Sequence, residues 1–201
     1  MIRKAKLRAR QDTIIQEYQR IFGRSTLPTD QQYWTMCSRC SPDSQFGDEY
    51  NQVINSGLIV PKQWYGVDID PEKIRLNAID YPESHWINMD FYRAMASAPT
   101  FRPGIVNIDT MSMPENAAPY VAEILDMLSK VPGQMMVVIN VVTQFSHIKR
   151  RKTSIEKFLT LLVQEPLYQE SYDRCGWQHD KKKYTYADVS EMTTLTFYRR
   201  K

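Results

Sequence analysis

The sequence is poor in cysteine and has no long apolar run. Its 201 residues include three cysteines, an odd number that is too small for a disulfide framework. We therefore expect a reducing, cytoplasmic setting. No run approaches the roughly 20 apolar residues of a membrane-spanning helix, so no membrane association is expected. No apolar stretch follows the basic first ten residues, which argues against a secretory signal peptide.

Several catalytic and ligand-binding motifs are also missing. The sequence has no Walker-type phosphate loop and no nucleophile-elbow motif, and its three histidines are isolated. Cys37 and Cys40 have the spacing of a metal or redox pair, but a structural zinc site needs four ligands. Cys175 and His179 could complete the set only from a distant part of the chain. We therefore expect no metal site.

What is present is a globular composition, with 42% hydrophobic and 24% charged residues. These proportions exclude a wholly disordered or fibrous chain. More than half of the 26 lysine and arginine residues fall in short blocks without acids: residues 3–10, 149–152, 181–183 and 199–201. Such blocks often contact polyanions, so the first three are candidates for binding a nucleic acid. The alternative is that they are solvated surface and tails.

Apolar periodicity predicts one basic helix followed by alternating strands and helices. The helix is expected over residues 3–22, so that residues 1–23 form an appendage to a domain of residues 24–201. Strands are expected at 32–37, 64–69, 85–89, 104–109 and 134–142, and helices at 48–57, 71–79, 91–97, 115–130 and 153–165. Two later strands are expected, one at 167–174 or 183–187 and one at 193–199. This alternation predicts an α/β fold with a parallel sheet, whose ligands bind at the carboxyl ends of the strands.

Three successive predicted strands end in an acidic residue. Asp68 follows the second strand, Asp90 the third, and Asp109 stands at the end of the fourth. A carboxylate after the second strand can accept hydrogen bonds from a ribose diol, and one after the third can accept from an adenine amino group. The alternative is that each of these carboxylates only caps the helix that follows it.

The segments GVDID at 66–70 and NMDF at 88–91 resemble class I S-adenosylmethionine-dependent methyltransferases, particularly small phage- or plasmid-type members. YTY at 184–186 and TLTFYRR at 194–200 are similar to the closing hairpin of that family, so the resemblance spans about 32–201. It implies a Rossmann-like, seven-stranded, mostly parallel sheet with helices on both faces and a C-terminal antiparallel hairpin. It also implies S-adenosylmethionine as the cofactor.

The resemblance assigns roles residue by residue. Asp68 would hold the ribose hydroxyls and Ile69 would pack on adenine. Asp90 would accept from the adenine amino group, and the main chain at Phe91 would face a ring nitrogen. Asp109, with Thr110 and Met111, would line the methyl-transfer site and act as the catalytic residue.

The sequence departs from the family after the first strand, where residues 35–44 contain no glycine. The small residues Cys37 and Ser38 would partly replace the usual glycine-rich turn at the cofactor. The stretch 108–114 lacks the motif of amino-directed DNA methyltransferases.

Two hypotheses for the function follow from the sequence. One is an active methyltransferase with an unidentified acceptor, a nucleic acid being favoured by the basic blocks. The other is a methyltransferase-like fold that has lost catalysis and binds nucleic acid or protein.

Overall fold

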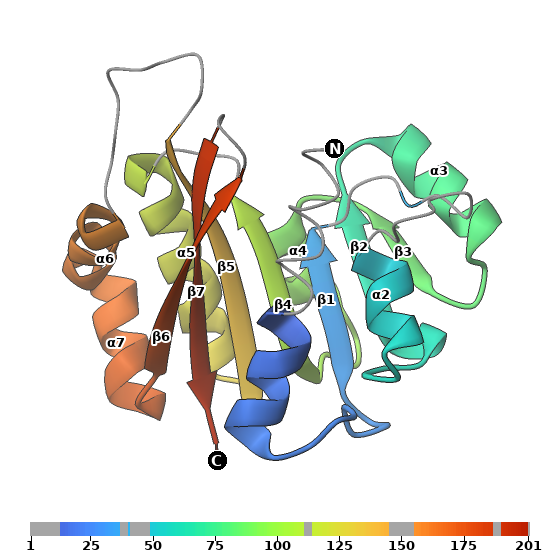
Figure 1. The fold of residues 1–201 in the computed structure, drawn as a ribbon, viewed down its shortest axis with the longest axis horizontal. Coiled ribbons are helices and arrows are strands. Elements are labelled where there is room, and N and C mark those ends of the chain that lie inside the picture. Colours follow the sequence, from blue (N-terminus) through green and yellow to red (C-terminus); the bar gives the residue numbers. More distant parts are fainter. Residues whose placement is uncertain are drawn as a thin grey trace. The chain divides into compact units, whose positions relative to one another are not determined.

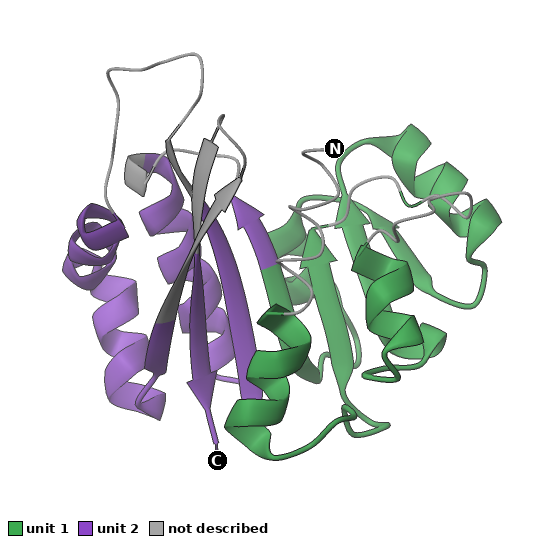
Figure 2. Cartoon of the chain, viewed as in Figure 1, with its two compact units in different colours: residues 1, 3–107 green, residues 2, 108–201 purple. Residues whose placement is uncertain are grey.

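The computed structural model describes residues 13–36, 40, 49–110, 114–144, 155–186 and 190–200. These residues form two compact units, shown in green and purple in Figure 2. The described part of unit 1 lies within residues 13–107, and that of unit 2 lies within residues 108–200. The prediction of a single domain over 24–201 stays a prediction.

Seven strands form one sheet in the order β3-β2-β1-β4-β5-β7-β6. The strands are β1 (Gln32–Met36), β2 (Trp64–Asp68), β3 (His85–Asn88), β4 (Pro103–Thr110), β5 (Met135–Gln144), β6 (Gln178–Tyr186) and β7 (Ser190–Arg199). β1 pairs in parallel with β2 and β4, and β2 pairs in parallel with β3. β7 pairs antiparallel with β5 and with β6. The predicted fold class, with its C-terminal antiparallel hairpin, is confirmed.

The helices alternate with the strands as predicted up to β5, and two helices in succession separate β5 from β6. They are α2 (Glu49–Asn55), α3 (Pro71–Asp80), α4 (Phe91–Ser97), α5 (Pro114–Ser129), α6 (Ile155–Gln164) and α7 (Pro166–Cys175), with a short 3-10 helix, η1 (Pro61–Gln63). A further helix covers residues 13–22, within the predicted 3–22. No helix in the described ranges is both long enough and apolar enough to cross a membrane.

The strand considered at 167–174 is wrong, because this segment is helix α7. Pro166 occupies its first turn, and Gly176 ends it in the left-handed conformation at φ 61°. Tyr168 and Ser171 are its buried residues, three positions apart as on a helix face. The other candidate, at 183–187, falls largely within β6, which begins earlier, at Gln178.

Unit 1 is built on aromatic side chains that alternate between the two faces of its strands. On one face Tyr33 stacks on Trp64, with ring centroids 5.0 Å apart, and Tyr50 of α2 packs edge-on against Trp64. On the other face Trp34 stacks on Tyr65 at 4.7 Å. Each stacked pair joins directly opposed residues of β1 and β2. In Figure 1, α2 lies in front of these strands and α4 behind them. The aromatic pairs therefore fix the register that aligns the ends of β1 and β2.

Unit 2 is built around β5, whose residues from Met135 to Ile139 are all buried. β7 pairs along most of its length, and α5 carries a buried apolar face that includes Val121, Ile124 and Leu125. α6 and α7 pack against α5 (Figure 1). The strand order places β5 inside the sheet, between β4 and β7, which agrees with the expectation that the apolar run at 135–142 is a central strand.

Candidate functional site

Asp68 is the last residue of β2 and carries the side chain predicted to hold a ribose. Its Oδ1 accepts a hydrogen bond from the Asp70 main-chain nitrogen at 2.8 Å. Its Oδ2 lies 3.3 Å from the ammonium group of Lys73. The side chain is 16% exposed, so the carboxylate is held firmly but still reaches solvent. The hydrogen bond with Asp68 is the main reason why the pKa of Lys73 is raised.

The capping role after β2 belongs to Asp70 and not to Asp68. Asp70 Oδ1 accepts from the main-chain nitrogens of Glu72 and Lys73, at 3.0 and 3.4 Å. Pro71 follows it in the first turn of α3, where a missing N–H costs nothing. The two acids that flank Ile69 therefore have different roles. Asp70 caps helix α3, and Asp68 presents its carboxylate at the end of β2.

The end of β3 is tied to the end of β2. The Asn88 side-chain amide and the Met89 main-chain nitrogen both donate to the Asp68 carbonyl oxygen, at 3.0 and 3.2 Å. Asp90 follows directly and caps α4, because its Oδ1 accepts from the Arg93 nitrogen at 3.1 Å. The capping alternative is therefore observed for Asp90. A carboxylate has two oxygens and about four lone-pair sites, so this single bond leaves capacity to accept from a ligand.

Two large apolar side chains next to these acids in the sequence, those of Ile69 and Met89, are exposed. Ile69 is 77% exposed and Met89 is 41% exposed, whereas Phe91 is only 3% exposed. Phe91 is buried and packs α4 against the rest of unit 1. The exposed pair gives an apolar surface beside two carboxylates, and this combination suits a flat heteroaromatic ring attached to a diol.

These residues fit an adenosine group, which was predicted from the sequence. The acceptor groups are chemically appropriate. Asp68 is an oriented carboxylate that can accept from hydroxyl donors, Asp90 can accept from an amino donor, and the exposed apolar side chain of Ile69 follows Asp68 in the chain. Asp68, Ile69, Asp90 and Phe91 all belong to unit 1, and the main-chain ties between β2 and β3 bring their strand ends together.

Other predicted site residues are not part of this group. Cys37, Ser38 and Met111 lie outside the described residues, as do the basic segments 3–10 and 149–152 and the side chains of 181–183. Asp109 is half-buried near the end of β4 and belongs to unit 2. Its catalytic role stays a prediction. Among the residues that the structure describes, no group of three His, Cys, Asp or Glu side chains is placed to hold a metal.

Sequence reasoning missed two charged residues at this edge of unit 1. Lys73 reaches Asp68 from one turn into α3, and Glu49 lies at the start of α2. The signal for Lys73 was present in the sequence, because a lysine in the first turn of a helix that follows an acidic strand end lies within reach of that acid. No signal marked Glu49, whose partners come from two separate strands.

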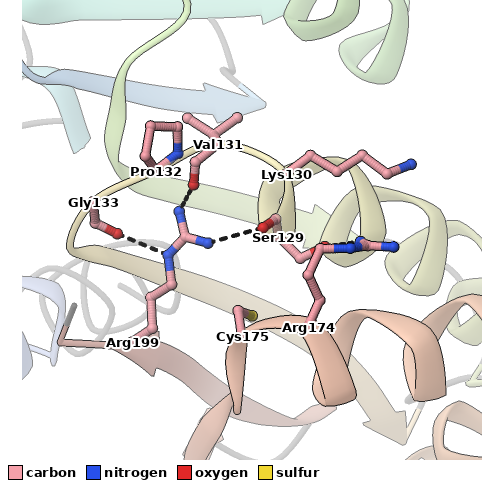
Figure 3. Close-up of a pocket in the computed structure, with 8 residues that line it drawn as sticks. All are labelled: Ser129, Lys130, Val131, Pro132, Gly133, Arg174, Cys175 and Arg199. Carbon is pink, nitrogen blue, oxygen red and sulfur yellow. Dashed lines mark hydrogen bonds between the residues drawn. The ribbon is translucent and has the colours of Figure 1, made fainter.

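A pocket of about 470 Å³ in unit 2 lies near the amino-terminal end of β5, beside Gly133 and Pro132 (Figure 3). Its charged side chains are engaged with the protein itself. Arg199 donates to the carbonyl oxygens of Ser129, Val131 and Gly133. Arg174 donates to the Asp126 carboxylate at 2.9 Å. These bonds bind the end of α5 to β7 and α7, so we interpret the pocket as structural.

No protein-family model matches the sequence, and a search of curated proteins finds no match. Solved structures do match the fold. The plantazolicin methyltransferase BamL, in complex with a triazolic desmethylPZN analog and SAH, has a TM-score of 0.64 and 11% identity, over 98% of this chain and 91% of that chain. The N-methyltransferase NodS from Bradyrhizobium japonicum WM9 has a TM-score of 0.59 and 11% identity, over 96% of each chain. Cofactor-bound Rv0187 from MTB has a TM-score of 0.55 and 9% identity, over 85% of this chain and 74% of that chain. The chain therefore has the fold of the methyltransferases BamL and NodS.

Proposed function

We propose that the chain is an S-adenosylmethionine-dependent methyltransferase. The observation that carries the proposal is the group at the ends of β2 and β3, where Asp68, exposed Ile69 and Asp90 match the chemistry of adenosine. The fold supports it, because similar structures include a methyltransferase solved in complex with SAH and a protein solved with a bound cofactor. The small phage- or plasmid-type subgroup and the cytoplasmic location stay predictions.

The residues of unit 1 would bind and orient the nucleoside. Asp68 is already oriented by the Asp70 N–H, so its carboxylate can accept from ribose hydroxyls without rearranging. Ile69 would lose its exposed surface against the ring, and Asp90 would accept from the amino group. When bound, S-adenosylmethionine supplies an electrophilic methyl group on sulfonium. A protein that catalyses this reaction mainly has to align the methyl donor with the methyl acceptor and to exclude water.

Asp109 is proposed as the residue that orients the acceptor or takes its proton. A half-buried carboxylate near a strand end is suited to that role. Asp109→Asn keeps the size of the side chain but removes the base. We expect it to lower the rate of methyl transfer and to leave affinity for SAH unchanged, which separates catalysis from cofactor binding.

The binding test is isothermal titration of the protein with S-adenosylhomocysteine. We expect measurable heat with the wild type. In Ile69→Asp, a charge replaces the apolar side chain, and the affinity should fall by about tenfold or more because a charged group would be desolvated against the ring. Ile79→Asp is the matched control, since Ile79 is 61% exposed on α3 and has no proposed contact. Absence of heat with the wild type at millimolar ligand would refute the cofactor assignment.

We also propose a nucleic acid as the methyl acceptor, on the basis of the basic segments 3–10, 149–152 and 181–183. Transfer of a labelled methyl group to RNA or DNA should weaken steeply as salt rises, because phosphate contacts release counterions. If nucleic acid binds in this salt-dependent way while S-adenosylhomocysteine does not bind, the protein is instead a binding module that has lost catalysis. If neither binds, both assignments fail.

A further inference from the structure

The pocket near the amino-terminal end of β5 contains a buried positive charge without an acidic partner. Arg199 lines this pocket and is 6% exposed. Its guanidinium donates to three main-chain carbonyl groups, and among the described residues it forms no ion pair. Burial lowers the pKa of Arg199, because desolvation disfavours the charged form. Buried charges in proteins are as a rule paired, so this guanidinium lacks a counter-charge.

Two further cations line the same pocket (Figure 3). Lys130 lies 2.7 Å from Asp126 Oδ2, and Arg174 lies 2.9 Å from Asp126 Oδ1. Asp126 is the only acidic partner of either cation in the part of the chain that the structure describes. Arg174 and Arg199 also share a partner, because Arg174 donates to the Ser129 hydroxyl and Arg199 to the Ser129 carbonyl. Three positive groups therefore have one carboxylate between them.

The other side chains of the pocket add no negative charge. Cys175 lines it, and burial raises the pKa of the thiol, although Arg199 and Arg174 act in the opposite direction. The thiol is therefore uncharged at neutral pH. Within the described ranges, no acidic side chain lines the pocket. The electrostatic potential inside the pocket is therefore positive, which favours an anion as its ligand.

The bonds that hold the end of α5 use only part of the available donors. An arginine has five N–H groups and a lysine ammonium has three. Arg174 binds Asp126 and Ser129 through Nη1, and its Nε and Nη2 make no hydrogen bond to the described residues. The Lys130 ammonium makes one bond, to Asp126. The side chains of Arg174 and Lys130 are 36% and 59% exposed, so their remaining donors can reach a ligand.

We propose that this pocket binds a phosphate ester through Lys130, Arg174 and Arg199. A phosphate monoester has a charge of about −1.5 to −2 at pH 7 and three strong acceptor oxygens, which matches the excess of positive charge. Guanidinium and ammonium groups are common phosphate ligands in proteins. The volume of about 470 Å³ lies in the range of small-molecule sites, so the phosphate can carry an organic group. This inference does not depend on the proposed function.

The competing role of these cations is purely structural, as links from α5 to α7 and β7. Three variants that keep Arg199 separate the two roles. Lys130→Gln and Arg174→Gln each remove one positive charge, whereas Asp126→Asn removes the carboxylate that competes with a ligand. A structural role predicts loss of stability and no tighter binding in any variant. The proposal predicts weaker phosphate binding in the first two and tighter binding in the third.

The experiment titrates each protein with glycerol 3-phosphate at low ionic strength, with glycerol as the uncharged control ligand. We expect the wild type to bind the phosphate ester and not glycerol. Affinity should fall by about fivefold or more in Lys130→Gln and Arg174→Gln, and rise by about threefold or more in Asp126→Asn. Arg200→Gln and Asp173→Asn change exposed charges of unit 2 that do not line the pocket, and should stay within about twofold of the wild type.

A single-stranded RNA oligonucleotide is the second ligand, because its backbone offers the same phosphate chemistry. The variant pattern with RNA, in the absence of binding of glycerol 3-phosphate, would identify a nucleic-acid backbone as the source of the phosphate. The inference fails if the wild type binds neither ligand, if Asp126→Asn binds no more tightly, or if Arg200→Gln weakens binding as much as Lys130→Gln does. Because Lys130 is 59% exposed, Lys130→Gln decides the matter even if thermal unfolding shows that Arg174→Gln does not fold. S-adenosylhomocysteine should bind every folded variant as it binds the wild type, so the two proposals fail separately.

Discussion

Gly66 of the GVDID segment is required for packing as much as for any ligand. A Cβ at this position would lie 2.5 and 2.7 Å from ring carbons of Trp86 and 2.8 Å from the Trp64 indole nitrogen. Contacts this short are a steric clash. Trp86 and Trp64 pack against other aromatic rings, so a small shift of their side chains cannot remove it. The resemblance to methyltransferases directed attention to Asp68, but the adjacent glycine is explained by aromatic neighbours.

Gly66→Ala should therefore destabilise the protein by about 1–3 kcal/mol, as expected for overpacking of a filled core. Urea denaturation measures the change. The double variant Gly66→Ala with Trp86→Leu should lose less than the sum of the two single variants, because the smaller side chain makes room for the methyl group. Additive losses would mean that the clash with Trp86 is not the cause.

At the residue scale, the sequence predicted which acids stand at strand ends but not how their oxygens are used. Asp68, Asp70 and Asp90 look alike in the sequence. Their separation into one oriented carboxylate and two helix caps depends on main-chain geometry two or three residues away. Glu49 shows the same limit more clearly, because Tyr33 and Asn107, which both donate to its carboxylate, are 16 and 58 residues away in the chain.

Helices α5 and α7 are joined by a charged cluster centred on Asp126. Its side chain is 11% exposed, and it pairs with Lys130 at 2.7 Å and with Arg174 of α7 at 2.9 Å. Burial alone would raise the pKa of Asp126, but hydrogen bonds and charges from Lys130 and Arg174 outweigh it, so the pKa is lowered. The ionised form is therefore more favoured in the folded protein than in the unfolded chain.

This direction fixes the sign of a pH dependence. The stabilisation is complete above the unfolded pKa of about 3.9 and is lost as pH falls through the lower folded pKa. We expect Asp126→Asn to lower the free energy of unfolding by about 1 kcal/mol at pH 7. The difference from the wild type should shrink below about pH 4. A difference that is constant from pH 7 to pH 3, or that equals that of the exposed Asp173→Asn, would contradict this account.

The end of α5 is held by Arg199 of β7 (Figure 3). Arg199 is 6% exposed and donates to three carbonyl groups at alternate positions, those of Ser129, Val131 and Gly133. Its guanidinium also lies 5.6 Å from the Trp177 ring centroid. A planar group with several donors satisfies the carbonyl at the end of the helix, that of Ser129, and two carbonyls in the turn that follows it.

Arg199→Met should thus cost about 2–3 kcal/mol, because it leaves the buried bond to Ser129 and the partly buried bonds to Val131 and Gly133 without their donor. Arg199→Lys should recover only part of the loss, since an ammonium cannot match three acceptors in this arrangement. Chemical denaturation followed by tryptophan fluorescence measures both. The neighbouring Arg200→Met is the control, because Arg200 is exposed, and an equal loss there would show that positive charge alone matters.

At the element scale, prediction succeeded where apolar periodicity was long and failed where it was short. The strand ends near Asp68, Asn88 and Thr110 were placed within a residue or two. The strand prediction for 167–174 was wrong because this segment contains large apolar and aromatic residues, among them Leu167, Tyr168 and Tyr172, and aromatic residues are common in strands. The decisive signals were Pro166 and Gly176 at its two ends.

For the whole molecule, alternating elements were sufficient to predict an α/β sheet. The pattern of the sequence predicted seven strands, and the family resemblance predicted the terminal antiparallel hairpin; the structure confirms both. The acceptor could not be predicted, because composition indicates only that polyanions are favoured. The chemistry that selects an acceptor depends on the arrangement of surface groups, which a single sequence does not contain.

The account depends on adenosine binding at the ends of β2 and β3, and Asp68→Asn tests it most directly. The asparagine oxygen can still accept from the Asp70 N–H, so the turn is preserved while the charge toward the ribose is lost. By isothermal titration, we predict that S-adenosylhomocysteine binds the wild type and the exposed control Asp30→Asn equally, and binds Asp68→Asn about tenfold or more weakly. Equal affinity of Asp68→Asn and the wild type would contradict the account.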